Sequence, residues 1–214
     1  MMSKKRKRSD DERAVYVILE LASLELVKTK KELTLLNGDD HGSVLAKHGR
    51  SESRPDIVHQ ELMACLDSPL SKAGKLRVYV RTRQRVLIEV HPETRIPRTY
   101  KRFAGLFAQL LQRKKVKATD GTVLLRIIKN PAPLPAGTAT YGFSKAGTRY
   151  TPHHFAASLP EGPVAFVFGA MASGSIDKED NMLDMVSIST YPLSGATAIH
   201  RVLGALEAHW GLES

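Results

Sequence analysis

Four cations, Arg95, Arg98, Lys101 and Arg102, open the segment TRIPRTYKRFAGLFAQLL. Pro97 is typical of a first helical position, and the apolar residues after it recur at helical spacing, which predicts a helix with one apolar stripe. That stripe consists of Phe103, Leu106, Phe107, Leu110 and Leu111. Cations at a helix N-terminus are mildly destabilising because that end is the positive end of the macrodipole. A phosphate would reverse the balance, since free N–H groups, the dipole and the guanidinium groups would all bind it.

The motif RPDIVHQ places a second pair of charges at the start of another predicted helix. Asp56 falls in the first turn, where a carboxylate interacts favourably with the helix dipole. The same carboxylate lies two residues after Arg54 and could hold its guanidinium in a bidentate geometry. The sequence leaves both roles open.

Positive charge is the strongest compositional signal in this chain of 214 residues, which has a net charge of +10 and a pI near 9.8. Residues 68–88 contain six basic residues and no acid, and residues 95–119 contain eight and no acid. A solvated basic face explains any single lysine, but two acid-free blocks favour a polyanion, and we expect nucleic acid. The run at 4–8 predicts a disordered basic tail over 1–13 or a nuclear-import signal.

Two loops of small residues follow apolar strands near the C-terminus. GAMASG spans 169–174, and SISTYPLSG spans 187–195. Neither is a Walker loop or a GxGxxG fingerprint. Open α/β sheets bind cofactors at such strand ends, although glycine there also forms plain turns. Together the loops favour a cofactor crevice without naming the cofactor.

Other familiar chemistry has little support in the sequence. The single cysteine, Cys65, lies on an apolar helix face and excludes a disulfide framework within the chain or a cysteine-based zinc site. The adjacent residues of DDH at 39–41 predict a turn rather than a metal site. The histidines at 153–154 have no partner nearby in sequence. We expect no metal and, with no apolar run of about 20 residues, no membrane span.

Alternating and apolar runs predict a single α/β domain over 14–214 with a largely parallel sheet. Helices are predicted at 55–66, after Pro97 and at 196–210. Strands are predicted near 14–19, 32–36, 75–80, 85–90, 122–129, 163–169 and 183–187, with 75–90 forming a hairpin. The Pro- and Gly-rich stretch 132–162 is expected to be mostly loop, with a short strand near 140–143.

Eight motifs occur in one order: LLNGDDH, RPDIVHQ, LDSPLSKAGKL, VLIEV, RIPRTYKRFAGL, IKNP, GAMASG and STYPLSG. Together they closely resemble the family of small-subunit ribosomal RNA pseudouridine N1-methyltransferases of eukaryotes and archaea, which are ribosome-biogenesis enzymes of the SPOUT class. The resemblance runs from about Ala14 to Trp210. The basic tail is similar to that of the eukaryotic form, which implies a location in the nucleus and nucleolus.

This resemblance implies a SPOUT-type sheet with helices on both faces, a C-terminal trefoil knot over about 140–214, and a hairpin and basic helix that bind RNA. It also implies S-adenosylmethionine as cofactor, S-adenosylhomocysteine as product, a homodimer paired through the knot, and pre-ribosomal assembly factors as partners. The implied cofactor-binding residues are Phe143, Gly169, Gly174, Ile188, Ser189, Thr190, Tyr191, Pro192 and Leu193. The implied contacts to small-subunit rRNA are Arg54, Arg95, Arg98 and Arg102, with Asp56 stabilising Arg54.

Two positions depart from the family pattern, Ser173 in place of a common basic residue and Lys145 in the first knot loop. No residue stands out as the base for the N1 proton, so the catalytic residues stay open. The alternative to an enzyme is a non-catalytic rRNA-binding scaffold of pre-ribosomes.

Overall fold

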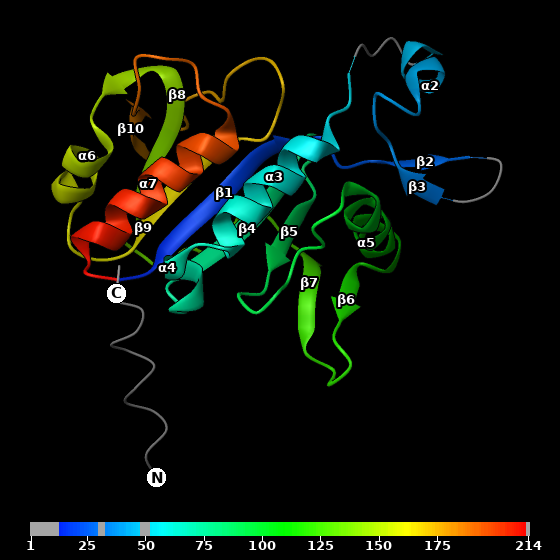
Figure 1. The fold of residues 1–214 in the computed structure, drawn as a ribbon, viewed down its shortest axis with the longest axis horizontal. Helices are drawn as coiled ribbons and strands as arrows, with labels where there is room; N and C mark the ends of the chain where they lie inside the picture. Colours follow the sequence, from blue (N-terminus) through cyan, green and yellow to red (C-terminus); the bar gives the residue numbers. More distant parts are fainter. Residues whose placement is uncertain (1–12, 30–32, 48–51, 213–214) are drawn as a thin grey trace.

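An eight-stranded sheet with the order β10-β8-β9-β1-β4-β5-β7-β6 forms the centre of the computed structural model (Figure 1). The structure describes residues 13–29, 33–47 and 52–212, so nearly all of the predicted basic tail lies outside it. The strands of this sheet are β1 (Val15–Ala22), β4 (Leu76–Thr82), β5 (Leu87–Val90), β6 (Lys115–Lys117), β7 (Val123–Ile128), β8 (Ala139–Arg149), β9 (Val164–Gly169) and β10 (Met182–Ser187). Pairing is parallel from β10 to β4 and antiparallel from β4 to β6. The predicted α/β class and mostly parallel sheet are confirmed.

The helices that pack on this sheet all contribute to a core cluster on one of its faces. The helices of the fold are α2 (Gly42–Lys47), α3 (Pro55–Leu66), α4 (Pro69–Lys72), α5 (Tyr100–Arg113), α6 (Pro152–Ser158) and α7 (Gly195–His209). The core on the opposite face includes Ala132 and Ile176 from loops, and no described helix contributes to it. The expectation of helices on both faces is therefore wrong for the described residues, because loop segments cover the second face.

Strand β1 lies between the two halves of the sheet and alternates its side chains between both faces. Val17 and Leu19 are fully buried under the helices, whereas Tyr16 and Ile18 point to the opposite face. This alternation of apolar residues on both faces is the pattern of a central strand in a largely parallel sheet.

The segment 132–162 contains more regular structure than the sequence predicted. Strand β8 has 11 residues, and α6 follows it, with the Thr151 hydroxyl accepting a hydrogen bond from His154 N at 3.3 Å as a helix cap. Strand β6 was also missed. β8 was missed because its small residues do not indicate a strand by themselves. It forms by pairing with β9 and β10, and β propensity depends on such nonlocal context.

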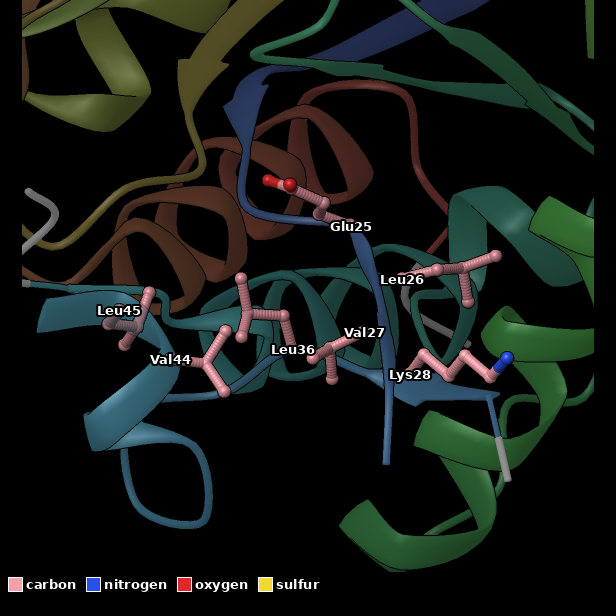
Figure 2. Close-up of a pocket in the computed structure, with 7 residues that line it drawn as sticks. All are labelled: Glu25, Leu26, Val27, Lys28, Leu36, Val44 and Leu45. Carbon is pink, nitrogen blue, oxygen red and sulfur yellow. The ribbon is translucent and has the colours of Figure 1, made fainter. Parts of the chain in front are cut away.

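A small unit of β2 (Leu26–Lys28), β3 (Leu33–Leu35) and α2 projects at one end of the molecule beside α5 (Figure 1). Its own core includes Val27, Leu36 and Leu45. Together with Glu25, Leu26, Lys28 and Val44, these side chains line a cavity of about 310 Å³. Figure 2 shows the lining residues. The DDH motif forms the predicted turn beside it, since Asn37 Oδ1 accepts from Asp40 N and Asn37 Nδ2 donates to Asp40 Oδ2, both at 2.8 Å.

One buried carboxyl interrupts the apolar contact between α3 and α7. Glu61 is 0% exposed, and neither of its oxygens has a hydrogen-bond partner among the described residues. Burial raises the pKa of Glu61 to about 8. The carboxyl is therefore mostly protonated at pH 7, because the charged form would be desolvated without compensation.

We expect Glu61→Gln to remove a pH dependence of folding stability. The folded protein keeps the Glu61 proton up to about pH 8, whereas the unfolded chain loses it near pH 4.5, so stability falls as pH rises between these values. Denaturant unfolding should show that the free energy of unfolding of the Gln variant, relative to that of the native chain, rises by on the order of 3 kcal/mol from pH 4 to pH 7. Exposed Glu161→Gln is the control, and stability curves of native chain and Glu61→Gln that stay parallel over this range would contradict a raised pKa.

Candidate functional site

Three loops with predicted cofactor residues lie at the carboxyl edge of the parallel half of the sheet. β8, β9 and β10 run parallel, so the segments that follow them emerge at one edge. Gly169 pairs in register with Glu20 at the end of β1, and Ile188 directly follows β10. The structure thus brings all three predicted loops to the edge where α/β sheets bind ligands.

The first loop is an irregular part of β8. Gly142 pairs with Met185, but the next pair of the β8–β10 ladder is Thr148 with Val186, so residues 143–147 bulge out of it. The Phe143 ring stacks on Phe168 at a centroid distance of 4.3 Å. This side chain is part of the core, which leaves its main chain as the group that can face a ligand.

The second loop follows β9, and its start is held against β1, because Ala170 N donates to Glu20 O at 2.7 Å. Gly174 has φ of +99°, which favours glycine. Residues 172–175 are exposed, and their main-chain groups form no backbone hydrogen bond to any residue that the structure describes. The loop therefore offers free N–H and C=O groups.

The third loop is held by its own serines and by two apolar residues. Ser187 Oγ donates to Ser189 O at 3.1 Å, and Tyr191 N donates to Ser189 Oγ at 3.0 Å. Ile188 is buried and Leu193 packs against the main core, whereas Tyr191 is 76% exposed. Thr190 and Pro192 are also exposed. The loop thus has a fixed base and an open outer side.

An ion-pair cluster beside the second loop was not predicted. Arg81 Nη1 lies 2.7 Å from Glu20 Oε1 and 3.5 Å from Glu179 Oε1, so it joins the ends of β1 and β4 to the segment before β10. Burial raises the pKa of Glu20, and the charge of Arg81 opposes that shift. No sequence pattern indicates this cluster, because its members are far apart along the chain.

The predicted pair in RPDIVHQ is confirmed. Arg54 Nε donates to Asp56 Oδ1 at 2.9 Å, and Arg54 Nη2 donates to Asp56 Oδ2 at 2.7 Å. These hydrogen bonds lower the pKa of Asp56. Arg54 is the N-cap residue of α3, and no side-chain hydrogen bond caps this helix end. Asp56 therefore orients an exposed guanidinium and also places an anion in the first helical turn.

The helix after the arginine-rich motif begins later than predicted. Thr99 is the N-cap of α5 in an extended conformation, so Pro97, Arg95 and Arg98 precede the helix. Only Lys101 and Arg102 lie in its first turn. The prediction that this helix starts at Pro97, with all four cations at its N-terminus, is wrong for Arg95 and Arg98, because tertiary contacts hold their segment in a nonhelical conformation.

His59 provides one of these contacts and was missed as a positioning residue. Its Nε2 donates to Pro97 O at 2.7 Å, and its ring stacks on Phe103 at 4.5 Å. The side chain is 5% exposed. A signal was available, since His59 lies one turn after Pro55 on the inward side of the helix.

The arginines of this segment differ in their partners. Arg98 forms a bidentate ion pair with Asp67, the C-cap residue of α3. Arg95 and Arg102 are exposed and form no salt bridge with any described residue. A phosphate could bind these two directly, but it would have to compete with Asp67 for Arg98.

Arg54 and the three loops lie at the same edge of the sheet. α3 ends just before α4, and a short connection leads from α4 to the start of β4, which pairs with Val15 at the start of β1. The end of α3 therefore lies at the amino edge of the parallel strands, and its first turn lies at the carboxyl edge. Figure 1 shows the first turns of α3 and α7 at this end. The exposed guanidinium of Arg54 therefore lies at the same edge of the sheet as the three small-residue loops.

Several other features form no part of this site. The cavity of Figure 2 lies in the β2–β3–α2 unit. A second cavity of about 390 Å³ is lined by residues that include Arg77, Glu89 and Arg126. Cys65 is buried, and burial raises the pKa of its thiol. Within the described ranges, no three metal-ligating side chains cluster, and no helix is long and apolar enough to cross a membrane.

Comparison with known proteins decides the family. Residues 17–207 match the model of the EMG1/NEP1 methyltransferases. The chain belongs to the EMG1/NEP1 methyltransferase family. The mouse protein named ribosomal RNA small subunit methyltransferase NEP1 is 47% identical over 207 residues, covering 94% of this chain and 83% of the relative. The Nep1 of Thermococcus sibiricus is 33% identical, with 81% of each chain covered.

A solved structure of an EMG1/NEP1 family member supports the same fold. The crystal structure of Archaeoglobus fulgidus Nep1 bound to S-adenosylhomocysteine matches with a TM-score of 0.75 and 27% identity, covering 92% of this chain and 99% of that chain. Membership in the EMG1/NEP1 family confirms that the chain is a methyltransferase, as its motifs predicted.

The Arg54–Asp56 pair should show a measurable coupling in folding stability. We expect Asp56→Asn and Arg54→Ala to be non-additive in a double-mutant cycle, with a coupling of about 0.2–1 kcal/mol, because both side chains are partly exposed to water. The pKa of Asp56 is lowered in the folded state, so the coupling should be present at pH 7, begin to decrease below the unfolded value near 3.8, and be lost as pH falls through the lower pKa of the folded state. Full additivity at pH 7 would show that the residues act independently.

Proposed function

We propose that this chain transfers the methyl group of S-adenosylmethionine to N1 of a pseudouridine in small-subunit ribosomal RNA. The observation that carries the proposal is a shared edge: the three loops, of which 172–175 has free main-chain groups, lie at the carboxyl ends of the parallel strands, and α3 begins at that edge with the exposed guanidinium of Arg54. The names of the relatives support rRNA as substrate, and the bound S-adenosylhomocysteine of the archaeal structure supports the cofactor.

The loops fit S-adenosylmethionine because they present main-chain donors and acceptors with few bulky side chains. Residues 172–175 offer free N–H and C=O groups, and the positive φ of Gly174 favours glycine in this loop. The residues assigned to the cofactor are Phe143, Gly169, Gly174, Ile188, Ser189, Thr190, Tyr191, Pro192 and Leu193. When bound, the cofactor supplies an activated methyl group on a sulfonium.

The chain's own contribution is to bind and orient the RNA. Arg54, Arg95, Arg98 and Arg102 would contact phosphates, with Asp56 holding Arg54 in one orientation. The target nucleotide must leave the base stack, since a stacked N1 cannot meet the methyl group in line. Much of the rate enhancement would then come from positioning. No side chain of the site is assigned as the base that accepts the N1 proton.

The wider assignment follows the family resemblance. We propose a single domain over 14–214 with a trefoil knot over about 140–214, through which two chains pair as a homodimer. The basic tail 1–13 would direct the protein to the nucleus and nucleolus, where pre-ribosomal assembly factors are its partners. A scaffold role could coexist with catalysis, because the arginine surface does not depend on a bound cofactor.

The proposed reaction is tested by methyl transfer from labelled S-adenosylmethionine to a small-subunit rRNA hairpin. We expect label in a hairpin that carries pseudouridine at the target and none when uridine stands there. Binding of the hairpin without any transfer would leave only the scaffold role.

The cofactor assignment predicts that Gly169→Val lowers the affinity for S-adenosylhomocysteine in a folded protein. A Cβ at Gly169 would lie 2.8 Å from Met171 Cε and 3.4 Å from Ile176 Cγ2, so the valine side chain would push aside the end of the Met171 side chain and crowd the start of the loop. Calorimetry should show a loss of about tenfold or more, while circular dichroism shows an unchanged fold. Unchanged affinity would remove this loop from the site.

The RNA assignment predicts opposite effects of two changes in one ion pair. Arg98→Ala should weaken RNA binding and reduce the salt slope by about 1 if one phosphate contact is lost. Asp67→Asn should strengthen binding, because Arg98 is released from its bidentate partner and one negative charge is removed. Filter binding at several salt concentrations measures both, and weaker binding by Asp67→Asn would show that the pair positions the segment instead.

A further inference from the structure

Glu61 and Gly195 form an unusual contact between two long helices. Glu61 lies in the middle of α3, and Gly195 is the first residue of α7. A Cβ built on Gly195 would lie 1.9 Å from Glu61 Oε1, 2.9 Å from its Cδ and 3.5 Å from its Cγ. The carboxyl thus occupies the space that any other residue at position 195 would need for its side chain.

Space is the reason that glycine is required at this position. The φ of Gly195 lies outside the left-handed region, so backbone conformation does not demand glycine. Glu61 could make room only by moving its terminal carboxyl, and it is 0% exposed within the α3–α7 contact. The close approach of these two helices therefore depends on this pairing of a large and a minimal side chain.

Stability alone does not account for the carboxyl. Both Glu61 oxygens lack hydrogen-bond partners among the described residues, and a buried polar group without a partner is costly. Burial also keeps the group largely protonated, since it raises the pKa of Glu61 to about 8. An apolar side chain of similar size would fill the space without this cost.

The contact lies directly behind the third loop. Residues 188–193 lead into Ser194, whose Oγ accepts from Thr197 N at 3.3 Å and caps α7. Leu193 packs against the main core, so the end of the loop moves with the first turn of α7. At the other end of α7, Glu207 Oε1 accepts from Leu70 N at 3.3 Å, which fixes that end against α4. A change in spacing at Gly195 is then transmitted to the loop.

We propose that Glu61 is a positioning residue for the cofactor loop, because its carboxyl, accommodated by Gly195, sets the spacing between α3 and the first turn of α7 and thereby the placement of residues 188–193. This inference rests on the proposed assignment of that loop to S-adenosylmethionine. Glu61 itself need not touch the cofactor.

The test measures the affinity of the full chain for S-adenosylhomocysteine by calorimetry at pH 7, with thermal unfolding of each variant. Gly195→Ala should weaken binding by about tenfold, and the double variant Glu61→Ala with Gly195→Ala should recover most of the loss. Gly204→Ala is the matched control in the same helix, because a Cβ there meets nothing within 4 Å. Its affinity should stay within about twofold of the native chain.

A purely structural role would give a different pattern. In that case Gly195→Ala would lower the unfolding temperature but leave the cofactor affinity of the folded protein unchanged, and the proposal would be overturned. Absence of recovery in the double variant would also overturn it. In methyl-transfer assays we expect Gly195→Ala to raise KM for S-adenosylmethionine more than it lowers kcat, while RNA affinity stays the same.

Substitutions of Glu61 alone test the same proposal without a change at Gly195. If Gly195→Ala does not fold, Glu61→Gln should keep the native affinity, since it preserves size and neutrality, and Glu61→Ala should lose affinity. Equal affinity of these two variants would contradict the proposal. Failure of the native chain to bind S-adenosylhomocysteine at all would instead refute the proposed cofactor site.

Discussion

The parallel pairing of β1 with both β9 and β4 is the constraint on which the site depends. β1 is buried on both faces and joins the parallel half of the sheet to the antiparallel half. Because its neighbours run in the same direction, the loop after β9 emerges beside the end of β1, where Ala170 N bonds to Glu20 O. Because β4 runs parallel to β1, the chain must also return along α3 to the amino edge before β4 begins. The first turn of α3, with Arg54, therefore lies at the carboxyl edge. One strand thus places a set of free main-chain groups next to an exposed cation.

Two of the arginines lie before α5 rather than in its first turn, where the positive end of the helix dipole would make them unfavourable. Arg95 and Arg98 precede α5, and the hydrogen bond from His59 to Pro97 holds their nonhelical segment against α3. Only Lys101 and Arg102 bear the dipole cost, which is at most about 1 kcal/mol for each charge. Arg95 remains open to an anionic partner without a cost to the helix, whereas Arg98 is paired with Asp67.

Local patterns predicted much of this structure, and nonlocal contacts explain what they missed. β1, α3 and α7 were predicted because apolar spacing or helix-start signals in their own residues define them. β8 was missed because its small residues become a strand only when β9 and β10 lie alongside, and Gly147 allows its backbone to approach that of Met185. The Arg54–Asp56 pair was predicted because its members are two residues apart, whereas Arg81–Glu20 and Arg98–Asp67 join distant segments. Of these two, Arg81–Glu20 lies beside the second loop, whereas Arg98–Asp67 lies at the C-terminal end of α3.

The most direct test of this account is a structure of the protein with S-adenosylhomocysteine and an rRNA hairpin that carries the target pseudouridine. The account predicts the sulfur in contact with the loops after β8, β9 and β10, and the flipped base with N1 facing that sulfur. Phosphates on either side of the base should contact Arg54 and the arginines before α5. RNA bound at the amino edge of the sheet, or on the face opposite the helices with its target base remote from the sulfur, would contradict it.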